Sequence, residues 1–118
     1  HAKSATGDTL QAVKNHEYAN PFEAPGTADL TTHVDFETLA HAIRAGGADA
    51  HGPVGQGAFL TALGIDGRAE ALSRNATASQ REDIERARQR LTGAHEMGSL
   101  FKVLGITPRG NALPAGFA

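Results

Sequence analysis

Residues 100–107 limit the fold more than any other part of the chain. They are mostly apolar and Pro108 follows them directly, which predicts one largely buried β-strand that ends at the proline. Each backbone amide and carbonyl of a strand needs a hydrogen-bonding partner, so one strand cannot form a sheet alone. The other strand candidates are weak: residues 48–54 contain a Gly-Pro pair, and residues 9–13 fit a short edge strand or one helical turn equally well.

The clearest helix begins at Asp35 and ends at a glycine pair, Gly46-Gly47. Its apolar residues recur with the spacing of one helix face, at Phe36, Leu39, Ala40 and Ile43. Asp35 can act as the N-cap, because its carboxylate accepts hydrogen bonds from the free amides of the first turn. Glycine tolerates the left-handed conformation that commonly follows a helix, so the helix is expected to end at the glycine pair.

Three further helices are expected, at residues 56–63, 68–74 and 77 to about 91. In the last of them Thr77 and Gln80 have the spacing of a capping box, in which each side chain bonds the other residue's backbone amide. Its surface is highly charged, and Glu82 and Arg86 are spaced to form an ion pair one turn apart. It is therefore predicted to be an exposed outer helix.

The inventory of one good strand, one or two doubtful strands and four helices indicates an incomplete α/β fold. We interpret the chain as one portion of a larger domain, with residues 1–34 mostly irregular, residues 35–107 forming helices and strands, and residues 108–118 forming a tail. Loops are expected at residues 19–32 and 93–98. The chain begins with His1 rather than Met, which adds to the expectation that sequence lies upstream.

Composition excludes several classes of function. The chain has 11 basic and 13 acidic residues and a formal net charge of −2, so no basic surface for nucleic acid or an anionic membrane is expected. It has no Cys, which excludes disulfides, Cys-ligated zinc and thiol catalysis. No apolar run approaches the ~20 residues of a membrane span, so a soluble protein is expected.

The side chains that could carry chemistry give no complete catalytic set. Asp29, His33 and Asp35 lie in one short stretch and could bind a divalent ion. Hydrogen bonds that fix the loop are favoured instead, because Asp35 already has a capping role and no HExxH motif is present. No Ser lies in a GxSxG elbow, and the Gly-rich turn at residues 52–57 lacks the Lys-Ser/Thr of a phosphate loop. No metal ligand, cofactor-binding residue or catalytic residue is therefore assigned.

Five stretches of the chain resemble the MidA-type methyltransferases, in the order in which that family carries them. They are GDTLQAV at residues 7–13 with His16 and Pro21-Phe22 after it, PGTADLTTHVDF at 25–36, GPVGQGAFLTALGI at 52–65, RAEAL at 68–72 and EMGSLFKVL at 96–104. Together they cover nearly the whole chain, so the chain as a whole is similar to this family.

The resemblance implies a class I, Rossmann-like fold that uses S-adenosylmethionine, with this chain as its C-terminal part. That fold ends in flanking helices and an antiparallel strand pair, which would be residues 48–54 and 100–107. The family's Gly-rich cofactor loop and the acidic residue that binds the ribose lie upstream, so the resemblance implies no cofactor site in this chain. The parent protein would be the enzyme, and this chain alone is expected to be inactive and to bind no cofactor.

Members of the family in mitochondria are protein-arginine methyltransferases that support respiratory complex I assembly, whereas most bacterial members have an unknown substrate. The resemblance therefore implies a protein substrate methylated on arginine, with a complex I subunit as one candidate. A eukaryotic parent would act in the mitochondrial matrix, and a bacterial parent in the cytoplasm. The oligomeric state is left open.

The resemblance also indicates which residues face a substrate. His1 would follow a sheet strand at its carboxyl end, the edge where open α/β sheets bind ligands. The loop that carries Asp29, His33 and Asp35, and the turn at Gln56, could close over the same substrate. Acidic and carbonyl groups suit a guanidinium cation. These five residues are therefore predicted to bind substrate.

Two other functions stay open. A non-catalytic interaction module would use the helices at residues 35–46 and 77–91 as a docking surface, and it predicts that the 118 residues fold on their own and bind a protein. A structural part of a different α/β enzyme predicts another cofactor signature upstream.

Overall fold

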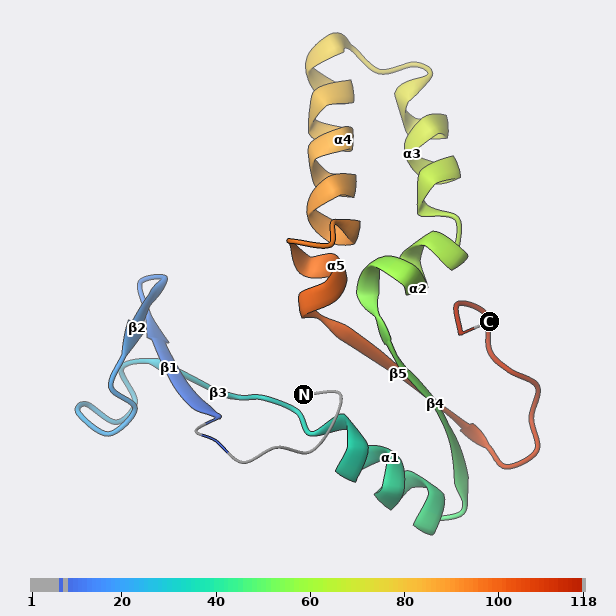
Figure 1. Ribbon diagram of the computed structural model, residues 1–118. Coiled ribbons are helices and arrows are strands. Elements are labelled where there is room, and N and C mark those ends of the chain that lie inside the picture. Colours follow the sequence, from blue (N-terminus) through green and yellow to red (C-terminus); the bar gives the residue numbers. More distant parts are fainter. Residues whose placement is uncertain (1–6, 8, 118) are drawn as a thin grey trace. The chain divides into compact units, whose positions relative to one another are not determined.

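A computed structural model of the chain describes residue 7 and residues 9–117. The chain forms two compact units, His1–Leu39 and Ala40–Ala118, and their boundary lies within helix α1 (Phe36–Ala45). The first unit is built on a small sheet, and the second combines a pair of strands with several helices (Figure 1). This mixture of helices and strands agrees with the α/β class predicted from the sequence.

The sheet of the first unit has three antiparallel strands in the order β2-β1-β3. They are β1 (Leu10–Lys14), β2 (Glu17–Ala19) and β3 (Asp29–Thr32). Residues 9–13 thus contribute a strand, and it is the central strand of its sheet rather than an edge. The predicted loop at residues 19–32 is wrong where β3 forms, because β3 obtains its hydrogen bonds from β1, a partner that the local sequence does not reveal. The region 1–34, predicted to be mostly irregular, therefore contains this whole sheet.

A two-residue turn joins β1 to β2. Asn15 and His16 both have positive φ angles, of 52° and 65°. Two central residues with positive φ are typical of a type I′ turn, whose twist matches that of the strands on either side. The turn therefore fixes the register of the hairpin, in which Val13 lies opposite Tyr18.

The cap of α1 forms as the sequence predicts. The backbone amide of Thr38 donates to Oδ1 of Asp35 at 3.0 Å, and the Thr38 hydroxyl donates to Oδ2 at 3.0 Å. The first amides of a helix have no partner within it, so this carboxylate supplies one. At the other end Gly47 adopts a φ of 88°, the left-handed conformation expected there. On the apolar stripe Ala40 is buried, whereas Leu39 remains 40% exposed.

The second unit contains the strand pair that the sequence predicts. Its strands β4 (Ala48–Gly55) and β5 (Lys102–Pro108) are antiparallel and bonded to each other. The ladder is irregular between His51 and Val54, where the sequence predicts that the Gly-Pro pair interrupts the strand. The two partners are separated in the chain by all the remaining helices, so this pairing closes a long loop.

Residues 100–107 are less buried than predicted. In the described chain Ile106 is 60% exposed and Phe101 is 48% exposed. Side chains alternate between the two faces of a strand pair. The Phe117 ring covers the pair at Gly105, while Ile106, the next residue, points to the other face. The apolar pattern therefore predicted the strand correctly from residue 102 onward, but residues 100 and 101 precede it and the predicted burial within this chain is wrong.

Four helices lie between β4 and β5 along the chain: α2 (Gln56–Ala62), α3 (Ile65–Ser73), α4 (Ala78–Thr92) and α5 (Met97–Leu100). Helices α3 and α4 run side by side as a helical hairpin (Figure 1). The predicted capping box of Thr77 and Gln80 is present at the start of α4. Helix α5 corrects the prediction of a loop at residues 93–98, because the last two of these residues belong to the helix. Its single turn is closed by the Phe101 amide, which donates to the Met97 carbonyl at 3.0 Å.

Helices α2, α4 and α5 meet at the carbonyl of Thr92, the last residue of α4. A Cβ atom added to Gly57 of α2 would lie 2.5 Å from this carbonyl oxygen, and one added to Gly98 of α5 would lie closer still. Both glycines are buried. The helices therefore approach each other through backbone rather than through side chains, which only glycine allows at such distances.

Residues 109–117, the described part of the segment after β5, form no helix or strand, but they are more than the tail predicted for residues 108–118. They return to the strand pair, where the Phe117 ring lies 5.2 Å from the Phe59 ring of α2 and 6.3 Å from the His51 ring of β4, measured between centroids. Gly105 leaves room for this ring, because a Cβ there would lie 2.9 Å from it. The C-terminal segment is therefore part of the packing of the second unit.

Two glycine substitutions test the close approach of the helices. Gly57→Ala should lower the free energy of unfolding by about 1–3 kcal/mol, because the new methyl group collides with backbone that cannot move aside. Gly67→Ala is the matched control: Gly67 lies in α3 with open space around it, so alanine should raise stability by about 0.5–1 kcal/mol. Urea unfolding measures both. Equal stability of Gly57→Ala and the parent would mean that the helices do not meet at Thr92.

Candidate functional site

Of the five predicted substrate-binding residues, the structure describes three in the first unit: Asp29, His33 and Asp35. Asp29 is exposed at the start of β3, opposite Val13 of β1. His33 follows β3, and its backbone amide donates to the Thr9 carbonyl at 3.3 Å, which ties the residue to the sheet. His1 lies outside the described residues. Asp29 and His33 are therefore held by the same sheet, with Asp29 within it and His33 just beyond it.

Asp35 has a structural task in addition to any functional one. Both of its carboxylate oxygens accept hydrogen bonds from Thr38, and the residue is half-buried. A carboxylate engaged in capping the helix gives up part of its capacity to accept from a ligand. The capping interpretation of Asp35 is thus confirmed, while its contact with substrate stays a prediction.

Gln56 lies in the second unit and also makes structural contacts. Its side-chain amide donates to the Leu91 carbonyl near the end of α4 at 3.0 Å. Its backbone amide donates to the Phe101 carbonyl, just before β5, at 3.0 Å. Gln56 therefore joins the start of α2 to two segments far from it in the sequence. The contact with Leu91 could not be read from local spacing, because 35 positions separate the two residues.

One surface depression of the second unit lies beside α5, and none of the predicted site residues lines it. It is open to solvent, has a volume of about 570 Å³ and is lined by Ala94, His95, Glu96, Met97, Ser99 and Leu100. The Ser99 hydroxyl is already engaged, since it donates to the Ala94 carbonyl. The depression offers an imidazole and a carboxylate but no enclosed volume in which a small ligand would be desolvated.

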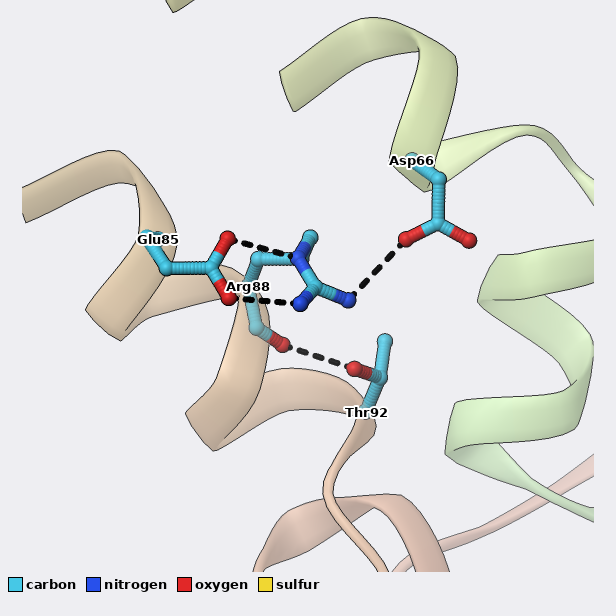
Figure 2. A network of polar contacts seen from close by, with 4 residues as sticks. All are labelled: Asp66, Glu85, Arg88 and Thr92. Atoms are coloured by element: carbon cyan, nitrogen blue, oxygen red, sulfur yellow. Dashed lines mark hydrogen bonds and ion pairs between the residues drawn. The ribbon is translucent and has the colours of Figure 1, made fainter. Parts of the chain in front are cut away.

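A network of charged side chains joins α3 and α4 (Figure 2). Arg88 donates two hydrogen bonds to the carboxylate of Glu85, at 2.9 and 2.6 Å, and a third to Asp66 of α3 at 3.0 Å. The hydrogen bond from Arg88 lowers the pKa of Glu85, and the bond to Glu85 raises the pKa of Arg88. Every charge in this network has a partner, so we interpret it as a brace between two helices rather than as a reactive site.

The neighbouring surface of α4 corrects one predicted contact. Arg86 lies 3.5 Å from Asp83, one position away from the predicted partner Glu82. Both spacings place charges on the same side of a helix, so the sequence alone does not choose between them.

Metal and membrane sites can be judged only for the described residues. Among them, no group of three His, Asp or Glu side chains lies close enough to hold a metal ion. None of the described helices has the length and apolar character that crossing a membrane requires.

Comparison with known proteins identifies the family. Residues 1–54 match a family model described as "Putative S-adenosyl-L-methionine-dependent methyltransferase". The protein arginine methyltransferase NDUFAF7 homolog, mitochondrial, of Drosophila melanogaster is 38% identical over 102 residues, which are 86% of this chain and 23% of that protein. The Homo sapiens protein arginine methyltransferase NDUFAF7, mitochondrial, is 32% identical over 102 residues, with the same two coverages. The chain belongs to the MidA-type methyltransferase family.

Two solved structures from Burkholderia thailandensis support the same conclusion for this methyltransferase family member. A COG1565 superfamily protein bound to S-adenosyl-homocysteine is 31% identical, with a TM-score of 0.79 over 92% of this chain and 28% of that one. A second COG1565 structure gives 31% identity and a TM-score of 0.80 over 92% of this chain and 29% of that one. The expected α/β fold with its antiparallel strand pair is thus confirmed. The chain spans about a quarter of the length of the relatives that it matches.

The brace at Arg88 generates a prediction about pH. Because pairing lowers the pKa of Glu85 in the folded state, its contribution to stability is present above the unfolded pKa of about 4.3 and is lost as the pH falls through the lowered folded value. Replacing Arg88 by Met removes the partner. The difference in melting temperature between the parent and Arg88→Met should therefore be largest near neutral pH and should shrink as the pH falls to about 3.

Arg86→Met is the control for this measurement. Among the described residues Arg86 pairs with Asp83 of the same helix, and its side chain is 75% exposed, so its loss should change the melting temperature less than the loss of Arg88 at neutral pH. A gap between the parent and Arg88→Met that stays constant with pH would contradict a role for the Glu85 pair.

Proposed function

We propose that the chain is the C-terminal part of an S-adenosylmethionine-dependent methyltransferase that acts on arginine residues of proteins. One observation carries the proposal: nearly the whole chain superposes on a protein that holds S-adenosyl-homocysteine, yet it accounts for little more than a quarter of that protein. The names of the mitochondrial relatives supply the acceptor, a protein arginine. A respiratory complex I subunit is the candidate substrate for a mitochondrial parent, and a bacterial parent would act in the cytoplasm.

The Gly-rich turn at the start of α2 gives no support for a cofactor site in this chain. The Gly-rich turn that opens α2 is closed by backbone, because Gly57 lies against the Thr92 carbonyl and leaves no cradle for a ligand. The Gln56 amide beside it is occupied by Leu91. We therefore assign the cofactor site to the part of the methyltransferase outside this chain, and expect the 118 residues alone to be inactive.

The part left to this chain is to hold the acceptor. A guanidinium carries a positive charge that must be kept close to the donor and in one orientation. Asp29 offers an exposed carboxylate on the edge strand β3, and His33 follows just after that strand. Asp35 and Gln56 would contribute mainly by fixing α1 and α2, since their side chains are bonded within the fold. His1 remains a candidate in the substrate-binding set.

Cofactor binding separates this proposal from its alternatives. The full-length protein that carries this chain should bind S-adenosyl-homocysteine in a calorimetric titration, and the 118 residues alone should not. With radiolabelled S-adenosylmethionine, the full-length protein should transfer label to arginine in a protein acceptor. If the full-length protein binds no cofactor while the chain binds a protein partner, the non-catalytic interaction module replaces the enzyme.

A second prediction concerns His33. In the full-length protein, His33→Ala should lower the rate of methyl transfer by about 10- to 100-fold through misplacement of the acceptor, with little change in melting temperature. His41→Ala is the control, because His41 is exposed on the surface of α1. Equal activity of His33→Ala and the parent would remove His33 from the substrate-binding set.

A further inference from the structure

The two units of the chain carry opposite charge. Residues 1–39 contain six acidic and two basic residues, whereas residues 40–118 contain seven acidic and nine basic residues. The overall charge of −2 hides this difference. The first unit is therefore the part of the chain that attracts a cationic partner.

The most exposed large apolar side chain of the described residues lies in this acidic unit. Tyr18 of β2 is 82% exposed. An aromatic ring exposed on a sheet is accessible to a partner and can stack on a cationic side chain. The turn at Asn15 and His16 fixes the register of its strand, so the ring has a defined position on the sheet.

The register places a carboxylate on the same face as this ring. Val13 of β1 lies opposite Tyr18 on one side and opposite Asp29 on the other. Residues directly opposite each other share a face, and neighbouring strands are about 4.8 Å apart. Tyr18 and Asp29 thus start from positions roughly 10 Å apart, with the half-buried Val13 as the floor between them.

The two faces of this sheet differ in chemistry. The row of Tyr18, Val13 and Asp29, which we name the docking row, is continued on its face by the pair Gln11 and Thr31. The opposite face carries the apolar residues Leu10, Ala12, Ala19 and Leu30, and Ala12 on it is only 1% exposed. One face is thus partly covered within the unit, while the docking row is open at both of its ends.

An arginine side chain fits the docking row better than any other common group. A guanidinium stacks on an aromatic ring and at the same time donates paired hydrogen bonds to a carboxylate. The ring of Tyr18 and the carboxylate of Asp29 offer these two interactions within the reach of one long side chain, above an apolar floor suited to its methylene groups. A lysine ammonium can use the charge but not the flat, forked geometry.

We infer that the docking row binds an arginine-bearing segment of a protein partner. The inference rests on the proposed function only in identifying that partner as the methyl acceptor. The row holds the segment, so its residues are positioning residues for the transfer. The acidic charge of the unit speeds the encounter, and the ring with its carboxylate discriminates arginine from lysine.

The test measures binding without turnover. The probe is a fluorescent Gly-Arg-Gly-Arg-Gly peptide, titrated against the full-length protein without cofactor, and its lysine counterpart is titrated in parallel. We expect the arginine peptide to bind at least about fivefold more tightly than the lysine peptide. Tyr18→Ala and Asp29→Asn should each raise Kd for the arginine peptide by about tenfold, and Tyr18→Phe should keep it within about twofold of the parent.

A matched variant on the other face controls for damage to the sheet. Leu30 is 60% exposed on β3, next to Asp29 but on the opposite face. Leu30→Ala should leave Kd unchanged, and circular dichroism on every variant reports whether it folds. The inference is overturned if Tyr18→Ala binds the peptide as the parent does, or if Leu30→Ala weakens binding as much as Tyr18→Ala.

The two proposals fail separately. Binding that depends on Tyr18, without methyl transfer to any arginine, would support the docking row and contradict the proposed enzyme. Methyl transfer to arginine whose KM is unchanged in Tyr18→Ala would support the enzyme and overturn the docking row.

Discussion

The pairing of β4 with β5 is the constraint on which the second unit depends. Ala48 lies opposite Pro108 and Gly55 opposite Lys102, so the chain must leave the sheet after one strand and return to it only after four helices. Closing so long a loop costs conformational entropy, which the contacts made within the loop have to offset. These contacts lie close together. Helices α2, α4 and α5 meet at the Thr92 carbonyl, and Gln56 donates hydrogen bonds both to the end of α4 and to the residue before β5. The charged brace at Arg88 then joins α3 to α4 at the outer part of the loop (Figure 2).

Local rules predicted the parts of the fold that are stabilised locally. The cap at Asp35 and the capping box at Thr77 each involve residues three positions apart, and both were visible in the sequence. The elements that were missed depend on distant partners. The strand Asp29–Thr32 exists because β1 pairs with it, and Phe117 is part of the packing because Phe59 and His51 receive it. For the candidate site, the residue types showed which side chains are suited to bind a guanidinium. The hydrogen bond between Gln56 and Leu91 could not be predicted, because 35 positions separate the two residues.

Large apolar side chains remain exposed in the described residues, and the proposed function offers a reason. Leu100 is 75% exposed and Ile106 is 60% exposed, which is unusual for aliphatic residues next to or within a strand. The chain accounts for 28% of the Burkholderia thailandensis protein that it superposes on. In our proposal the remaining part of the methyltransferase covers these side chains and supplies the cofactor site. The docking row differs from them in pairing its exposed ring with a carboxylate, which suits a charged partner rather than a core.

The contact between Gly105 and Phe117 has a consequence for how related sequences can differ. The ring occupies the space that any side chain at position 105 would need. A larger residue at 105 is therefore compatible with this packing only if position 117 becomes smaller in the same lineage. The two positions, one within β5 and one near the end of the chain, should therefore covary across the family. A larger residue at one should be accompanied by a smaller residue at the other.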